Sequence, residues 1–165
     1  EIASAVGIGR TTLYEYFADR DDVIASLVEE ELPGVVEGLL AGLSAEMDPA
    51  QQLAEVAERT VRFVDTDPVL GLILHREVGR LTAEAQRRIR DAHTDLITGV
   101  ASIYARGVEK GSLHPMPVDL AGRFIQDTVM SAARAVISAA DPDSRLPEIV
   151  AGMRRFLLHG LAGNR

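Results

Sequence analysis

Side chains that can bind a phosphate or a base edge gather in a short segment near the start of the chain, RTTLYEY from Arg10 to Tyr16. Arginine can donate two hydrogen bonds to guanine, and threonine offers a hydroxyl and a methyl group to a base. Tyrosine hydroxyls commonly bond phosphate oxygens, which sets the register of a protein on DNA without reading its sequence. These residue types together favour contact with double-stranded DNA.

Two short amphipathic helices are expected to position this segment. Ile2 and Val6 lie on the apolar face of the first helix, and Gly7 ends it. Leu13 and Phe17 lie four residues apart in the second helix, so they share its inner face and leave the polar side chains outside. Two such helices joined by a tight glycine-containing turn predict a helix-turn-helix, whose second helix enters the major groove.

The charge of this region opposes DNA binding. Residues 1 to 22 hold two arginines, Arg10 and Arg20, against five carboxylates, a net charge of −3, and the whole chain carries −8. Because binding to phosphates needs an excess of Lys and Arg, periodicity and charge by themselves favour ordinary helix packing. The chain begins with Glu1 rather than Met, so we expect an N-terminal piece to be missing, and DNA binding would need basic residues from that piece.

Composition narrows the class of protein. The 165 residues suffice for one buried core, or for a small domain joined to a larger one. Cysteine is absent from the sequence, which excludes disulfides and thiolate metal sites, and a cytoplasmic location is the simplest expectation. No apolar run approaches the roughly 18 residues that would suggest a membrane span.

Apolar residues recur with helical spacing almost throughout, and no stretch alternates as a strand does, so the predicted fold is all-α. Pro33-Gly34 is expected to kink or split the helix around it. One long helix is expected from Thr82 to near Gly111, another from Val118 to a stop before Asp141, and a last helix after that residue. Helix starts are indicated by capping residues at Asp19, Asp48, Asp67 and Thr82.

The segment IASAVGIGRTTLYEYFADRDDVIASLV, from Ile2 to Val28, resembles the DNA-binding module of the TetR family of bacterial transcriptional regulators. That family combines an Ile-Ala helix, a Gly-Val/Ile turn and a Thr-Leu-Tyr-x-Tyr/His-Phe recognition helix. The resemblance implies a helix-turn-helix DNA-binding domain over residues 1–30, with its first helix missing from this sequence. It also implies a larger helical ligand-binding and dimerisation domain over residues 31–165.

The resemblance assigns roles position by position. Tyr16 and Arg20 would bind the phosphate backbone, and Leu13 and Phe17 would belong to the core. Gly9 stands where the family often has Ser or Thr, so the recognition helix loses a capping hydroxyl. The contacts from the recognition helix itself would come from Arg10, Thr11, Thr12 and Tyr14.

In the family the remaining helices bind a small molecule, so an apolar or amphipathic effector is expected between the helices from Asp48 to Ala140. Polar side chains on apolar faces are candidates for its contacts, because burying them costs free energy unless they find partners. Large side chains on the same helices could line the cavity. Ordinary core packing explains all of them as well, since a threonine can bond its own helix. The candidates are Thr60, Phe63, His93, Tyr104, Phe124 and Thr128.

The resemblance further implies a homodimer formed through the last two helices. Small residues between Ser131 and Ala135 would let another helix approach closely, and the final helix carries a clean apolar stripe. A buried pair of helices within one chain explains the same pattern, so the residues alone leave both interpretations open.

The resemblance to the family implies a repressor that a small molecule releases from its operator. The ligand would favour a dimer whose recognition helices no longer match successive major grooves, about 34 Å apart. Enzyme motifs are missing: no Glu lies three residues before a His, and there is no phosphate-binding glycine loop. No metal or cofactor is expected. The alternative is a helical small-molecule-binding or interaction protein without sequence-specific DNA binding.

Overall fold

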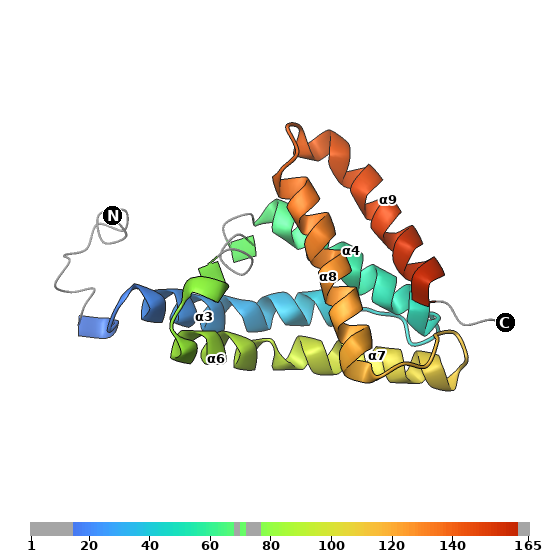
Figure 1. The fold of residues 1–165 in the computed structure, drawn as a ribbon, viewed down its shortest axis with the longest axis horizontal. Coiled ribbons are helices and arrows are strands. Elements are labelled where there is room, and N and C mark those ends of the chain that lie inside the picture. Colours follow the sequence, from blue (N-terminus) through green and yellow to red (C-terminus); the bar gives the residue numbers. More distant parts are fainter. Residues whose placement is uncertain (1–14, 68–69, 72–76, 162–165) are drawn as a thin grey trace.

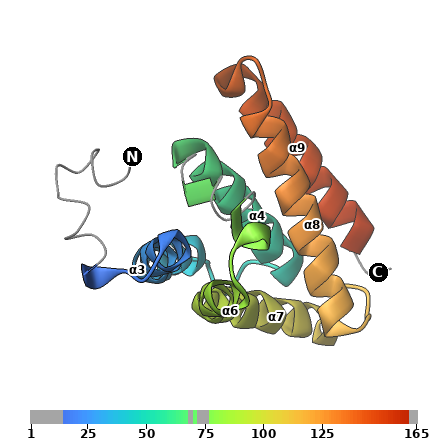
Figure 2. The same ribbon diagram turned by 60° about the vertical axis from the view of Figure 1, so that its left-hand side comes forward.

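The computed structural model describes residues 15–67, 70–71 and 77–161, and its elements keep the labels of Figure 1. Every regular element in these ranges is a helix, which confirms the predicted all-α fold. Helix α3 (Arg20–Leu40) lies beside α6 (Ala83–Ala92), which the short 3-10 helix η2 (Val78–Arg80) precedes, and α7 (Thr94–Glu109) extends the line of α6. Helices α4 (Pro49–Thr66), α8 (Val118–Ile137) and α9 (Pro142–Leu161) pack on one another at one side of this layer (Figure 2).

Two apolar clusters form the interior. One joins α4, α7, α8 and α9 and includes Val61 and Tyr104. The other, the α3–α6 cluster, packs α3 against α6 and includes Val28 and Ile89. Leu96 packs against both clusters, so apolar contacts continue from α3 to the helices of the first cluster. Each fully buried aliphatic or aromatic side chain contributes roughly 1.5–3 kcal/mol to such a core.

Capping residues begin the helices where the sequence predicts them. Asp19, Asp48 and Thr82 each accept a hydrogen bond from a backbone amide of the following turn, at 2.9, 2.9 and 3.3 Å. These bonds satisfy amides that have no partner within the helix. Asp67 likewise accepts from the amide of Leu70 at 2.9 Å, while most of the helix expected there lies outside the described residues.

Helix α3 is not split at Pro33-Gly34. Pro33 lies inside α3 on its exposed side, and the helix runs through it to Leu40. A proline removes one backbone hydrogen bond and strains the preceding turn. Leu32 and Val36 on either side are only 3% and 4% exposed, so burial of these neighbours holds the two halves of the helix together. The boundary predicted at residue 30 lies within this continuous helix and stays a prediction.

The single long helix expected after Thr82 is instead two helices that meet at His93. The amide of His93 donates to the carbonyls of Ile89 and Arg90, at 3.2 and 3.1 Å, and its ring Nδ1 lies 2.7 Å from the Ile89 oxygen. The ψ angle of His93 is −6°, compared with about −42° in a regular α-helix. The backbone therefore tightens at this residue, and α7 begins at Thr94.

Candidate functional site

The residues predicted to contact DNA fall mostly outside the described part of the chain, where Arg10, Thr11, Thr12 and Tyr14 lie. Tyr16 is described, and 77% of its surface is exposed. Its neighbour Phe17, which was expected in the core, is half-buried. The contrast between these two aromatic side chains agrees with an outward Tyr16 and an inward Phe17.

Arg20 opens α3 and is paired with a carboxylate of the helical body. Its Nη2 donates to Glu77 Oε2 at 2.7 Å, and its Nη1 lies 3.9 Å from Asp21 Oδ1. The hydrogen bond from Arg20 holds the pKa of Glu77 below its usual value. Because 59% of the Arg20 side chain is exposed, the guanidinium is both held by the body and accessible from solvent.

Two carboxylates in the first turn of α3 also connect this helix to its surroundings. Asp21 Oδ2 accepts from the amide of Thr82 at 2.7 Å. Asp22 accepts from the amide of Ala18 at 2.9 Å and from Nη1 of Arg88 at 2.5 Å. The amide of Ala18, and after it Arg88, lower the pKa of Asp22. Asp22 therefore links the segment before α3 to helix α6.

Arg88 stands at the centre of the contact between α6 and α3. Its guanidinium donates to the hydroxyl of Ser26 at 3.0 Å and to Glu29, in addition to Asp22, and its Nε lies 2.8 Å from Glu29 Oε1. The hydrogen bonds to Glu29 and Asp22 raise the pKa of Arg88, and Arg88 lowers the pKa of Glu29. Only 24% of the Arg88 side chain is exposed, so dissolved salt weakens its ion pairs with Asp22 and Glu29 less than it weakens a fully exposed ion pair.

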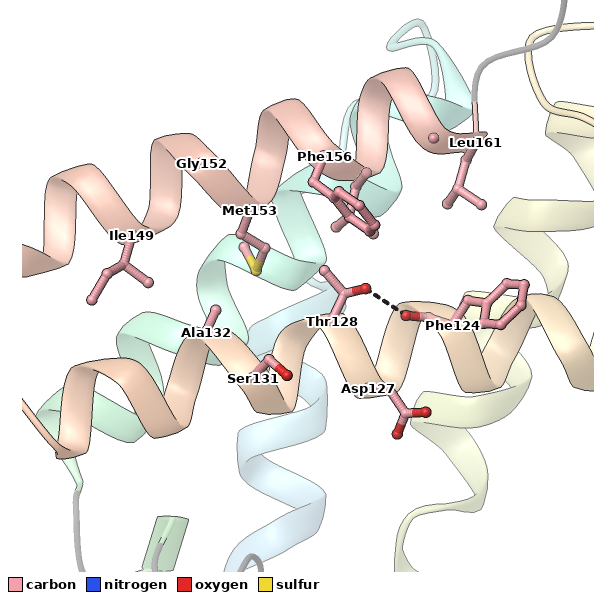
Figure 3. Close-up of a pocket in the computed structure, with 12 residues that line it drawn as sticks. Phe124, Asp127, Thr128, Ser131, Ala132, Ile149, Gly152, Met153, Phe156 and Leu161 are labelled. Carbon is pink, nitrogen blue, oxygen red and sulfur yellow. Dashed lines mark hydrogen bonds between the residues drawn. The ribbon is translucent and has the colours of Figure 1, made fainter.

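An apolar groove of about 700 Å³ lies along α8 and α9 (Figure 3). Phe124 of α8 and Phe156 of α9 line it and are 51% and 65% exposed. Buried side chains of Met153 and Leu157 line the same groove. Two of the predicted ligand residues, Phe124 and Thr128, are brought together here, although they face a surface and not an enclosed cavity.

A second groove, of about 360 Å³, lies between α3 and α4. Phe63, another predicted ligand residue, lines it together with Arg59 and Arg62. Gly34 and Gly38 line the groove on the α3 side and have no side chains to fill it. A Cβ built on either glycine would meet no described atom within 4 Å. Each arginine is paired with the glutamate four residues before it, at 3.0 and 2.8 Å. The groove thus joins apolar surface to two cationic side chains with carboxylate partners.

The two predicted threonines bond their own helices. Thr60 donates to the carbonyl of Val56 at 2.8 Å, and Thr128 donates to the carbonyl of Phe124 at 2.7 Å, the bond drawn in Figure 3. Their hydroxyls are therefore satisfied within the chain.

Tyr104 also has partners within the chain. It is only 2% exposed, and its hydroxyl donates to the carbonyl of His114 at 2.6 Å and accepts from the amide of Met116 at 3.0 Å. These bonds fasten the loop between α7 and α8. The last candidate, His93, uses its ring at the junction of α6 and α7. The six predicted ligand residues are thus distributed over the domain and do not converge on one cavity in the described structure.

Three charged residues that sequence reasoning did not single out join separate helices: Glu77, Arg88 and Arg154. Arg154 of α9 donates to Glu55 and Glu58 of α4, at 3.2 and 2.8 Å. These partners lie 99 and 96 residues away in sequence, so no local pattern could have indicated the contact.

The described ranges contain no group of His, Cys, Asp and Glu arranged to hold a metal ion. None of the helices described here is long and apolar enough to cross a membrane. The candidate sites described above therefore consist of ion pairs, at Arg20 and Arg88, and of two grooves with apolar lining.

Comparison with known proteins relates these features to one family. Residues 46–134 match the model of the family described as Tetracyclin repressor-like, C-terminal domain. The fatty acid metabolism regulator protein of Bacillus subtilis is 22% identical over 130 residues, which cover 78% of this chain and 67% of that protein.

Solved structures share the fold. The transcriptional regulator FadR from Bacillus subtilis, in complex with stearoyl-CoA, is similar with a TM-score of 0.80 and 20% identity, over 96% of this chain and 86% of that one. The fatty acid degradation regulator FadR from Bacillus halodurans also gives a TM-score of 0.80, with 22% identity over 99% and 84% of the two chains. Since the family match spans more than half of the 165 residues, this chain belongs to the Tetracyclin repressor-like family of transcriptional regulators.

Proposed function

We propose that this chain is a repressor that leaves its operator when a small amphipathic molecule binds to its helical body. The observation that carries the proposal is the position of α3. Its first turn holds Arg20, directly after the segment that resembles a recognition helix, while Ala25 and Val28 in the next turns are completely buried in the α3–α6 cluster. A rearrangement of the body therefore moves α3, and with it the DNA-contacting end.

The proposed contacts with DNA follow the family resemblance. Tyr16 and Arg20 would bind phosphates, and their exposures of 77% of the residue and 59% of the side chain support these roles. The carboxylates around them require basic residues from an upstream helix to make binding favourable. Base and phosphate contacts from the recognition helix are assigned to Arg10, Thr11, Thr12 and Tyr14.

A homodimer through α8 and α9 is the second part of the proposal. Each helix has 20 residues, which makes it about 30 Å long. Two helices spaced about 10 Å apart present a face on the order of 600 Å², close to the roughly 800 Å² per partner of a stable interface. Phe124 and Phe156 are exposed on this face, and a second copy would remove them from water.

The proposed effector is an anion with a long apolar chain, of which a fatty acyl thioester of coenzyme A is an example. The FadR structure with stearoyl-CoA supports this class. In this chain the α3–α4 groove offers Phe63 for an apolar chain, and 50% of the Arg62 side chain is exposed to meet a phosphate. A ligand in this groove would touch α3 directly. We assign the protein no catalysis and no cofactor, and we place it in the cytoplasm.

Fluorescence anisotropy with the full-length protein tests both parts. The probe is a duplex from the region upstream of its own coding sequence. We expect specific binding that stearoyl-CoA reverses and that coenzyme A alone leaves intact. No binding at low salt would overturn DNA regulation, whereas binding that stearoyl-CoA does not change would overturn the effector class alone.

A matched pair of variants locates the effector. Arg62→Gln should weaken the release by stearoyl-CoA about tenfold, since a charge-assisted contact is lost. Arg87→Gln is the control, because Arg87 is similarly exposed but lies on α6 and pairs within that helix. Equal effects of the two substitutions would place the ligand elsewhere.

A further inference from the structure

Arg20 has a partner in the body that resembles the partner it would have on DNA. We propose that Glu77 competes with DNA phosphate for Arg20, so that the contact between them lowers the affinity of the protein for its operator. This inference rests on the proposed function, because it takes Arg20 as a phosphate contact. It adds a regulatory role for Glu77, a residue outside the helix-turn-helix.

The geometry of the pair supports competition. Arg20 Nη2 donates to Glu77 Oε2 at 2.7 Å. A carboxylate and a phosphate both accept hydrogen bonds from the guanidinium fork, so the same N–H group cannot serve both acceptors fully. Asp21 lies 3.9 Å from the other terminal nitrogen of Arg20, which places carboxylates near both ends of the fork.

The pair is weak enough to exchange. The side chain of Arg20 is 59% exposed and that of Glu77 is 28% exposed, so water can replace either partner. Glu77 also lies 3.7 Å from Arg80, which would remain as its cationic partner after Arg20 turns to DNA. Exchange therefore leaves Glu77 beside Arg80, and Asp21 keeps its hydrogen bond from the amide of Thr82.

The position of Glu77 connects the competition to the body. Glu77 directly precedes η2, between α4 and α6, and Figure 1 shows this part of the chain beside the first half of α3. Asp21 accepts the amide of Thr82 at 2.7 Å, which sets the register between the first turn of α3 and the start of α6. A shift of this segment relative to α3 changes the distance between Glu77 and Arg20, and so changes how readily Arg20 reaches a phosphate.

Neutralising Glu77 in the full-length protein tests the competition. We expect Glu77→Gln to bind an operator duplex about two- to fivefold more tightly than the wild type, the range of an exposed ion pair. Glu77→Ser serves as a second variant, because glutamine retains an oxygen that can accept from Arg20. Glu84→Gln is the control for charge, since Glu84 is exposed and pairs with Arg87 inside α6. Thermal melting confirms that each variant is folded.

A double-mutant cycle separates competition from general electrostatics. In an Arg20→Gln background, Glu77→Gln should leave the DNA affinity unchanged. If Glu77→Gln and Glu77→Ser bind as the wild type does, or if Glu77→Gln tightens binding equally without Arg20, the competition is overturned while DNA regulation stands. A wild-type protein that does not bind DNA at low salt would overturn the proposed function and this inference with it.

Discussion

Replacing Phe156 with alanine is expected to separate the proposed dimer without unfolding the subunit. Phe156 is 65% exposed on α9 and lines the α8–α9 groove (Figure 3). Because most of its ring is in water in a single chain, truncation removes little from the core of the subunit. The main loss occurs in the dimer, where a second chain would cover the ring.

The magnitude follows from the exposed area of the ring. A phenylalanine offers about 200 Å² of surface, so about 130 Å² of Phe156 is available to a partner at 65% exposure. At about 25 cal/mol per Å², its burial contributes about 3 kcal/mol, of which alanine retains about a third. A twofold-symmetric dimer loses the remaining 2 kcal/mol or so twice. The dissociation constant should therefore rise on the order of a thousandfold.

Sedimentation velocity over nanomolar to micromolar concentrations measures this change. Ile97→Ala is the matched control, because Ile97 is 63% exposed but lies on α7, away from the groove. It should leave the dimer unchanged, and circular dichroism should show that both variants are folded. A Phe156→Ala protein that dimerises as tightly as the wild type would refute the proposed interface. Equal weakening by Ile97→Ala would also refute it.

Four further substitutions test the stability of the subunit. Arg88→Met should lower the melting temperature by about 2–6 °C at pH 7. The difference in melting temperature between the two proteins should shrink as the pH falls below about 4. Asp22 and Glu29, the carboxylate partners of Arg88, have lowered pKa values in the fold and lose their contribution to stability when they are protonated. Thermal melts of the wild type and the variant across this pH range measure the change. Tyr104→Phe should cost about 1–3 kcal/mol in urea unfolding, since the carbonyl of His114 loses its donor; an unchanged midpoint would contradict this role. Gly107→Ala should cost about 1–3 kcal/mol, because the added Cβ would clash with the side chain of Leu113, which is buried. In the same assay Gly122→Ala, whose Cβ would meet nothing within 4 Å, should gain up to about 1 kcal/mol.

Helix starts could be predicted from the sequence because a capping side chain bonds amides of its own first turn. Asp19 accepts from the amide three residues later, and Asp48 from the amide two residues later. The split expected at Pro33-Gly34 is absent for the opposite reason, while the kink expected there stays a prediction. Proline does destabilise a helix locally. The burial of Leu32 and Val36 beside it depends on residues of α6 and on the other members of the α3–α6 cluster outside α3, which lie far away in sequence.

The candidate sites were less predictable, because they depend on which helix faces meet. Phe63 and Phe124 were singled out by size and do line grooves, though two different ones. Tyr104 has the same appearance in the sequence, yet its hydroxyl is used by a carbonyl and an amide of the chain. Almost every residue offers a backbone carbonyl or amide, so the sequence does not show which of them a tyrosine hydroxyl will bond. Tyr104 belongs to the core because α7 packs against the loop that holds His114 and Met116.

Helix α3 is held at its two ends by different parts of the body. At its C-terminal end, Arg59 of α4 donates to the carbonyls of Leu39 and Ala41, at 3.3 and 2.6 Å. Arg59 also donates to Glu55, which accepts from Arg154 of α9, so the polar contacts run from α9 through α4 to this end of α3.

At the N-terminal end, the exposed pair of Arg20 and Glu77 connects α3 to the chain before α6. Between the two ends lie buried apolar contacts, including Val28, which is fully buried. Exposed ion pairs change partners at little cost, whereas buried apolar contacts are lost only when the helices separate. A shift of α4 or α9 that moves α3 as a unit is therefore accommodated most cheaply at Arg20, the residue that the proposed function places on DNA.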